Sequence, residues 1–161
     1  MHETDTDGAP GKQGRKMSRR TLLTLGVAAA AVSAAGVNYY RRLPFEGDTL
    51  DPAQARQLAT SGDIVLIDIR RPDEWEETGI GEGAVPIDMR RDDFIGALDA
   101  ILEGRRDRPV ALICARGVRS NRMSQRLADA GFQRVIDIPE GMLGSRAGPG
   151  WIKRGLPLVQ P

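Results

Sequence analysis

The feature that most constrains this chain is an apolar run that leads through a short polar loop into an amphipathic segment. Val110–Ile113 has the length and composition of a buried strand. In residues 120–131 the apolar side chains recur at helical spacing. The loop between them begins with Cys114, the one cysteine of the chain. The sequence therefore predicts a strand, a tight turn and a helix, with Cys114 at the mouth of the helix.

The residues around Cys114 favour a chemical role for it. A helix N-terminus carries unpaired backbone N–H groups and a partial positive charge. The loop adds Arg116 and Arg119, so the setting should favour a thiolate and hold an anion. Gly117 is expected to supply a backbone conformation that a Cβ would hinder. A lone cysteine is more often a small buried apolar residue, but this context favours a reactive one.

The rest of the composition excludes several kinds of site. The one histidine, His2, lies in the N-terminal tail, so a Cys–His pair and a His-ligated metal are excluded from the body of the chain. One cysteine also excludes a cysteine-cluster metal site and an intramolecular disulfide. We therefore predict no metal and no cofactor. Any activation of Cys114 must come from backbone dipoles and arginines.

Apolar runs alternate with helical patterns along the chain after residue 50. Besides residues 110–113, strands are expected at residues 64–69, 84–87 and 135–138, and helices at residues 51–62, 72–77, 94–104, 120–131 and 151–154. This alternation predicts an α/β fold, with a mostly parallel central sheet of about five strands and helices on both faces. Ligands of such sheets bind at the carboxyl ends of strands, where Cys114 and Asp68 both stand.

The N-terminal segment has the character of a targeting signal. Residues 18–23, Ser-Arg-Arg-Thr-Leu-Leu, resemble the twin-arginine export signal, and an uncharged, alanine-rich run continues to Val37. Cleavage after small residues is slightly favoured, but residues 21–40 with Arg41 and Arg42 behind them also fit an uncleaved membrane anchor. The protein is thus expected to be exported, either periplasmic or anchored to the outer face of the inner membrane.

Charge divides the chain at the same place. Up to Arg42 there are seven basic and three acidic residues, whereas the remainder carries sixteen basic and nineteen acidic ones. We predict a signal peptide or membrane anchor with a disordered tail at residues 1–41, a linker at 42–49 and one folded domain at 50–160. The near-zero net charge argues against a nucleic-acid partner.

Four segments, in order, resemble the rhodanese family of sulfurtransferases. The Cys114 loop is similar to the family's C-x-x-G-x-R active-site loop, and residues 64–75 to its strand, D-x-R and E-F/W segment. Residues 79–84 resemble its G-H-I-P-G-A segment, and residues 141–158 its closing G-G-M, W and G-L-P segment. The resemblance covers roughly residues 50–158 and departs at Ile80 and Glu82, where the family has histidine and proline.

The resemblance implies a rhodanese-like fold and a two-step sulfur transfer. Sulfane sulfur would pass from a donor such as thiosulfate to a thiol or cyanide through a persulfide on Cys114. The loop residues are expected to bind substrate, and three residues of the preceding segment to support the site: Ala115, Arg116, Gly117, Val118, Arg119 and Ser120, with Asp68, Arg70 and Glu74. The partners are a small-molecule sulfur donor and a thiol acceptor.

Several finer roles stay open at this point. Arg119 either contacts the donor or folds back onto an acid such as Glu74. Asp68 either accepts hydrogen bonds from the loop or pairs with Arg70, and Arg70 and Glu74 are expected to form a structural pair. Met142 and Leu143 are expected at the pocket rim, and Trp75 and Trp151 in core or rim packing.

Two other functions compete with sulfur transfer. A non-catalytic rhodanese-like module would bind a partner or regulate, but such modules usually lack the cysteine. A small phosphatase or arsenate reductase would need a loop one residue longer than the four residues that separate Cys114 from Arg119. The shorter loop fits a single sulfur atom better than a tetrahedral phosphate.

Overall fold

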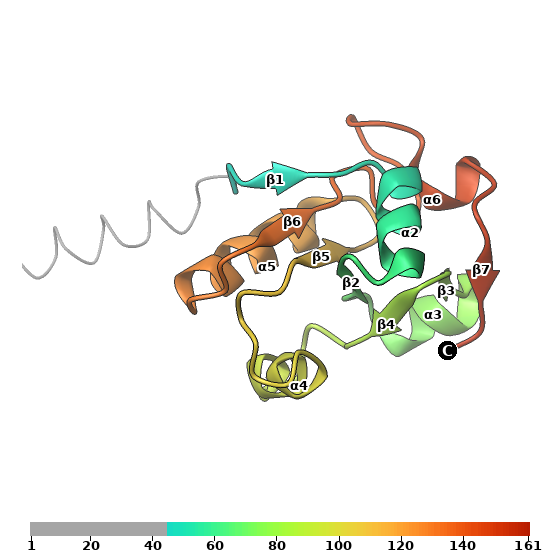
Figure 1. Cartoon of the computed structure of the whole chain (residues 1–161). Coiled ribbons are helices and arrows are strands. Elements are labelled where there is room, and N and C mark those ends of the chain that lie inside the picture. Colours follow the sequence, from blue (N-terminus) through green and yellow to red (C-terminus); the bar gives the residue numbers. More distant parts are fainter. Residues whose placement is uncertain (1–44) are drawn as a thin grey trace, which may run out of the picture. The chain divides into compact units, whose positions relative to one another are not determined.

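The computed structural model describes residues 45–161, and its core is a sheet of five parallel strands (Figure 1). In order across the sheet these are β1 (Asp48–Thr49), β6 (Val135–Asp137), β5 (Val110–Ile113), β2 (Val65–Asp68) and β4 (Ala84–Pro86). The short strands β3 (Ile80–Gly81) and β7 (Leu158–Val159) pair antiparallel in a second sheet. The predicted α/β architecture is confirmed, whereas the predicted export signal lies outside the described residues.

Helices cover both faces of the central sheet (Figure 1). They are α2 (Pro52–Ser61), α3 (Pro72–Thr78), α4 (Phe94–Ile101), α5 (Val118–Asp129) and α6 (Gly150–Lys153). One hydrophobic cluster joins α4 and α5 to the sheet, and a second joins α2 and α6 to the opposite face. No helix between residues 45 and 161 is long and apolar enough to cross a membrane.

Local chemistry explains where α2 begins and ends. The Asp51 carboxylate accepts hydrogen bonds from the backbone N–H groups of Ala53 and Gln54, and the Gln54 side chain accepts one from the Asp51 N–H in return. Gly62 follows the last turn at φ 83°, and its N–H returns to Ala59 O. The expected helix from Asp51–Pro52 to Gly62 is therefore confirmed at both ends.

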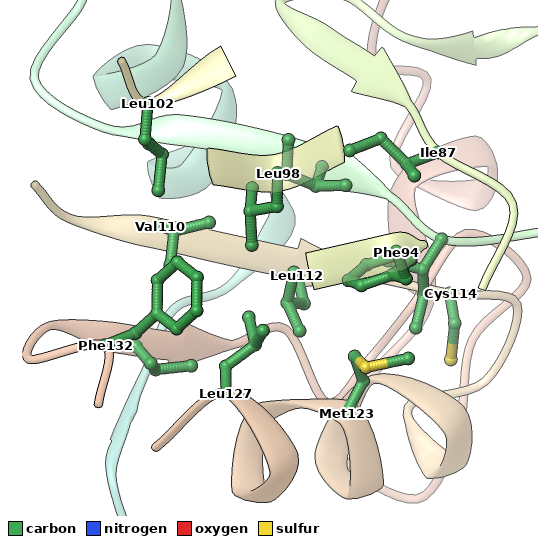
Figure 2. Close-up of a cluster of buried hydrophobic side chains, with 13 residues drawn as sticks. Ile87, Phe94, Leu98, Leu102, Val110, Leu112, Cys114, Met123, Leu127 and Phe132 are labelled. Carbon is green, nitrogen blue, oxygen red and sulfur yellow. The ribbon is translucent and has the colours of Figure 1, made fainter. Parts of the chain in front are cut away.

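Side-chain alternation along β5 decides which way Cys114 points. Val110 and Leu112 belong to the cluster under α4 and α5, and Ala111 and Ile113 belong to the other cluster. Cys114 continues this alternation and joins the first cluster. Figure 2 shows it at one end of that cluster. The cysteine therefore faces α5, at the carboxyl edge of the sheet.

Strand β1 lies in residues that were expected to be a linker. Asp48 and Thr49 pair with Ile136 and Asp137 of β6, and Leu50 N–H donates to Asp137 O at 3.1 Å. Two exposed polar residues have no strand periodicity of their own, so only the edge of β6 makes this segment extended.

Candidate active site

Cys114 directly follows β5 and is 1% exposed. The labelled side chains nearest to it in Figure 2 are Phe94 and Met123, so its Cβ side is packed in the core. The thiol itself meets a polar group, because Sγ donates a hydrogen bond to Ser120 Oγ in the first turn of α5 at 3.6 Å. The sulfur thus lies between the core and the helix N-terminus.

Gly117 shapes the loop that carries Cys114. It is the N-cap of α5, with φ 81° and ψ −21°, and an added Cβ would collide with the carbonyl of Pro139. Its own carbonyl accepts hydrogen bonds from Ser120 Oγ at 3.1 Å and from Asn121 N–H at 3.0 Å. The expected need for glycine at this position is therefore confirmed.

The backbone amides of the loop are available to an anion. Within residues 45–161, the N–H groups of residues 115–120 donate to no other protein group. They include the first-turn amides of α5, where the helix dipole adds partial positive charge. An anionic sulfur at this loop would therefore be stabilised without an imidazole or a metal.

The segment after β6 holds the loop through its backbone. Met142 N–H donates to Cys114 O at 2.8 Å, and Leu143 N–H donates to Ala115 O at 2.9 Å. Gly141 permits this approach, since a Cβ there would lie 2.6 Å from Ala115 O. Met142 is fully buried in the α2/α6 cluster, so its expected place at the rim is wrong, whereas Leu143 is 45% exposed.

Arg119 is paired with an acid from α3. Its guanidinium donates two hydrogen bonds to the Glu74 carboxylate, at 2.7 and 2.6 Å. The pair raises the pKa of Arg119 and lowers the pKa of Glu74, and the Cys114 sulfur adds a smaller effect on Arg119. Of the two alternatives for Arg119, the structure contains the ion pair.

Arg70 pairs with Asp68, which is one of the two alternatives for Asp68, whereas the expected Arg70–Glu74 pair is wrong. Its Nε and Nη2 atoms donate to the Asp68 carboxylate at 2.7–3.0 Å, and only the backbone carbonyl of Glu74 accepts from it. Further bonds run to Thr78 Oγ1 and Gly79 O. Both charged side chains are buried, so the pair fixes the connection between β2 and α3.

The side chain of Asp68 lies on the opposite face of the sheet from the side chain of Cys114. Leu66 packs in the α2/α6 cluster and Ile67 in the α4/α5 cluster, so alternation directs Asp68 to the α2/α6 face. Asp68 is in register with Ile113, the residue before the cysteine, which faces the same way. The carboxyl ends of the two strands do meet, but the two side chains point to opposite faces.

Arg116 and Val118 form the outer side of the loop. Arg116 is exposed, and its Nη1 donates to Gly144 O at 3.4 Å. Among residues 45–161 it has no acidic partner, so its charge is available to a ligand. Val118 is 60% exposed. Ala115, between Cys114 and Arg116, is half-buried.

The strand, the cysteine loop and the helix lie in a part of the chain that matches a known protein family. Residues 51–146 match the sequence profile of the rhodanese-like domain. This chain belongs to the rhodanese-like domain family. The matched residues contain β2, β5, β6 and the whole loop of Cys114.

The relatives that are similar to this chain are named for different activities. A sulfurtransferase of Allochromatium vinosum is 29% identical over 107 residues, 66% of this chain and 89% of that protein. A tRNA uridine(34) hydroxylase of Acinetobacter baylyi is 30% identical over 100 residues, 60% of this chain but 31% of that protein. The solution structure of the polysulfide-sulfur transferase homodimer of Wolinella succinogenes has 25% identity and a TM-score of 0.56, with 84% of this chain and 92% of that chain covered.

Sequence reasoning missed one residue of this rhodanese-like site, Asp137. It ends β6 on the face toward α5, is 1% exposed, and its Oδ2 accepts from Asn121 Nδ2 at 3.3 Å. Burial raises its pKa, and the polar side chains of Ser120 and Asn121 offset only part of that effect. The available signal was an acid inside the apolar run 135–138, at the same sheet edge as Cys114.

Proposed function

We propose that this protein is a sulfurtransferase that moves a sulfane sulfur from a donor such as thiosulfate to a thiol or cyanide through a persulfide on Cys114. The observation that carries the proposal is the place of the sulfur. It contacts the first turn of α5, beside amides of residues 115–120 that have no acceptor within the described chain. The family and the Allochromatium relative support the same class of reaction.

In the first step the Cys114 thiolate attacks the outer sulfur of thiosulfate. A new S–S bond forms at Cys114, the old S–S bond breaks, and sulfite leaves with the electron pair. The loop amides and the dipole of α5 stabilise the negative terminal sulfur of the persulfide. Arg116, which has a free charge at the outer side of the loop, attracts the anionic donor.

In the second step a nucleophilic acceptor attacks the terminal sulfur. The acceptor gains the sulfur, the S–S bond to Cys114 breaks, and the Cys114 thiolate leaves with the electron pair. With cyanide the product is thiocyanate, and with a thiolate it is a persulfide. The cycle returns the cysteine to its starting state, so it needs no redox cofactor.

The alternative is a non-catalytic rhodanese-like module that binds a partner. The observation that favours it is the 1% exposure of Cys114, which restricts access to the sulfur. For catalysis, the outer sulfur of the donor must reach Cys114 from the side of the loop where Arg116 and Val118 are exposed. The same experiment separates the two functions.

The experiment is turnover of thiosulfate and cyanide by the purified chain. We expect thiocyanate from the wild type and none from Cys114→Ser, with unchanged circular dichroism as the control for folding. Thiosulfate alone should raise the mass of the wild type by one sulfur atom and leave the variant unchanged. A folded wild type with neither turnover nor the mass increase would reject the enzyme and favour the binding module. An aryl phosphate tests the phosphatase alternative in the same preparation.

We further propose that residues 1–41 direct the protein out of the cytoplasm, as a cleaved signal or a membrane anchor. The paired arginines Arg19 and Arg20 before an uncharged run support this, and so does the basic charge of the segment. The reaction would then take place in the periplasm or at the outer face of the inner membrane.

A further inference from the structure

The surface around the Cys114 loop carries arginines that have no acidic partner. Arg116 of the loop, Arg122 of α5 and Arg146 of the segment between β6 and α6 are all exposed. No ion pair among residues 45–161 includes any of the three. Their positive charges are therefore uncompensated within the described part of the chain.

The segment that carries Arg146 lies against the loop. Leu143 N–H donates to Ala115 O at 2.9 Å, and Arg116 Nη1 donates to Gly144 O at 3.4 Å. Arg146 follows Gly144 by two residues. Residues 143–146 therefore border the loop directly, although they are far from it in the sequence.

Two exposed apolar side chains border the same loop. Val118 is 60% exposed and Leu143 is 45% exposed. Val118 is the first residue of α5, where its branched side chain contributes little helix propensity and buries little surface. Arg122 stands four residues later, so it lies on the same side of the helix as Val118. Together these residues form what we call the loop face: Arg116, Val118, Arg122, Leu143 and Arg146.

The loop face is basic although the domain as a whole is acidic. After Arg42 the chain carries sixteen basic and nineteen acidic residues. In the segments that follow β2 and β4, each exposed arginine is neutralised by an aspartate two residues away: Arg71 with Asp73, Arg90 with Asp88 and Arg91 with Asp93. The arginines of the loop face lack such neighbours, so this face presents positive charge to the solvent and attracts a negatively charged partner.

The chemistry of the loop face favours a polypeptide as that partner. No aromatic side chain in residues 45–161 is exposed, so the bases of a nucleic acid would find no surface for stacking. Val118 and Leu143 instead suit the aliphatic side chains of a protein. Because Cys114 is 1% exposed, a thiol on an extended segment can reach its sulfur more easily than a thiol on a flat folded surface.

We propose that the sulfur acceptor is a cysteine in a flexible acidic segment of a second protein, which docks on the loop face. Its carboxylates pair with Arg122 and Arg146, and its apolar residues pack on Val118 and Leu143. This rests on the proposed function, because it names the acceptor of the sulfur on Cys114. The acceptor thiol loses its proton to water and attacks the terminal sulfur of the persulfide. The S–S bond to Cys114 breaks, Cys114 leaves as a thiolate with the electron pair, and no oxidant or reductant is consumed.

The test is sulfur transfer from thiosulfate to two synthetic peptides by the full chain. Both peptides have a central cysteine with leucines beside it, and outside the leucines one carries glutamates and the other glutamines. The gain of a sulfur atom by each peptide is followed by mass spectrometry. We expect the KM for the glutamate peptide to be about tenfold lower, and added salt should reduce the difference. Equal KM values for the two peptides, or an equal KM for a small uncharged thiol, would overturn the proposal.

Variants assign the preference to the loop face. The double variant Arg122→Gln and Arg146→Gln should raise the KM for the glutamate peptide about tenfold and leave turnover of thiosulfate with cyanide unchanged. Arg134→Gln is the matched control, because Arg134 is also exposed but directly precedes β6, at the opposite edge of the sheet. The chain up to Arg42 is basic as well, so a preference for glutamate that survives the double variant would overturn docking on the loop face.

A binding measurement separates failure of docking from failure of sulfur transfer. Absence of turnover with cyanide would count against the proposed function alone. In that case the glutamate peptide, with serine in place of its cysteine, should still bind Cys114→Ser about tenfold more tightly than the matching glutamine peptide, as measured by fluorescence anisotropy. Equal binding of the two peptides would overturn the docking site. Tighter binding of a single-stranded RNA, lost in the double variant, would also overturn it and would assign the face to a nucleic acid.

Discussion

Arg119, in the first turn of the helix that follows the cysteine, is held by Glu74 of α3 through two hydrogen bonds of 2.7 and 2.6 Å. The two side chains are 29% and 17% exposed, so the pair is largely shielded from solvent. It ties the Cys114 loop to the segment that follows β2. It also engages one of the two loop arginines, which leaves Arg116 as the free charge for an anionic donor.

The first prediction concerns the stability that this pair supplies. Glu74→Gln should lower the free energy of unfolding at neutral pH by about 1–2 kcal/mol. Because folding lowers the pKa of Glu74, the contribution is complete above its ordinary value of 4.5 and is lost as the pH falls. Urea unfolding at several pH values measures this. Glu76→Gln, an exposed change in the same helix, is the control. An equal loss in both variants would contradict a specific role for the pair.

The buried pair of Arg70 and Asp68 should matter for folding more than for chemistry. Arg70→Ala leaves the Asp68 carboxylate buried without its cation and should cost about 3–5 kcal/mol of stability. Arg91→Ala is the matched control, because Arg91 pairs with Asp93 at the surface and its loss should leave the unfolding midpoint unchanged. A stable but inactive Arg70→Ala variant would instead place Arg70 in the reaction.

Gly117 and Gly62 allow backbone strain to be separated from steric exclusion. Both have positive φ, 81° and 83°, but a Cβ at Gly62 would meet nothing within 4 Å, whereas one at Gly117 would strike Pro139. Gly62→Ala should therefore lose only the strain, about 1 kcal/mol, and keep full turnover. Gly117→Ala should lose more stability and nearly all turnover with thiosulfate and cyanide. Comparable turnover in the two variants would show that the loop tolerates displacement.

Arg116 should act on donor binding. Arg116→Ala is expected to raise the KM for thiosulfate about tenfold with little change in kcat, because the charge acts mainly before the S–S bond breaks. Added salt should reduce the difference between variant and wild type. Arg126→Ala, which removes an exposed arginine from the last turn of α5, is the control and should leave KM unchanged. An unchanged KM in Arg116→Ala would remove Arg116 from the binding role.

The export proposal predicts a strict need for the arginine pair. Residues 1–40 fused to a reporter that is active only outside the cytoplasm should give a signal. The signal should disappear when Arg19 and Arg20 are both replaced by Lys, which keeps the charge. Replacement of Arg15 by Lys, within the same fused segment, is the control and should leave export intact. Export that survives the first replacement would reject the twin-arginine route.

Much of the fold could be read from short-range patterns. The run Val110–Ile113 and the cap at Asp51 each depend on neighbours in the sequence, and the structure has both as expected. The pairing of Asp48 with Ile136 could not be read this way, because the partner strand lies far along the chain. The pairs Asp68–Arg70 and Arg119–Glu74 are each one of two expected alternatives, and the structure contains both. The expected Arg70–Glu74 pair is wrong for a related reason: Asp68 and Glu74 are both close to Arg70 in sequence, and side-chain direction selects between them.

The sequence by itself determined that one cysteine would stand between a buried strand and a helix, with glycine and arginines in its loop. Apolar periodicity and residue type are local properties, so they can be recognised in the sequence alone. Only the tertiary structure decided which charged groups meet that cysteine. Because side chains alternate along β2, Asp68 faces the opposite side of the sheet from Cys114. Glu74 pairs with Arg119. The register of β6 places Asp137 on the same face of the sheet as Cys114. Such contacts depend on the direction of side chains from separate strands, and no local pattern encodes that direction.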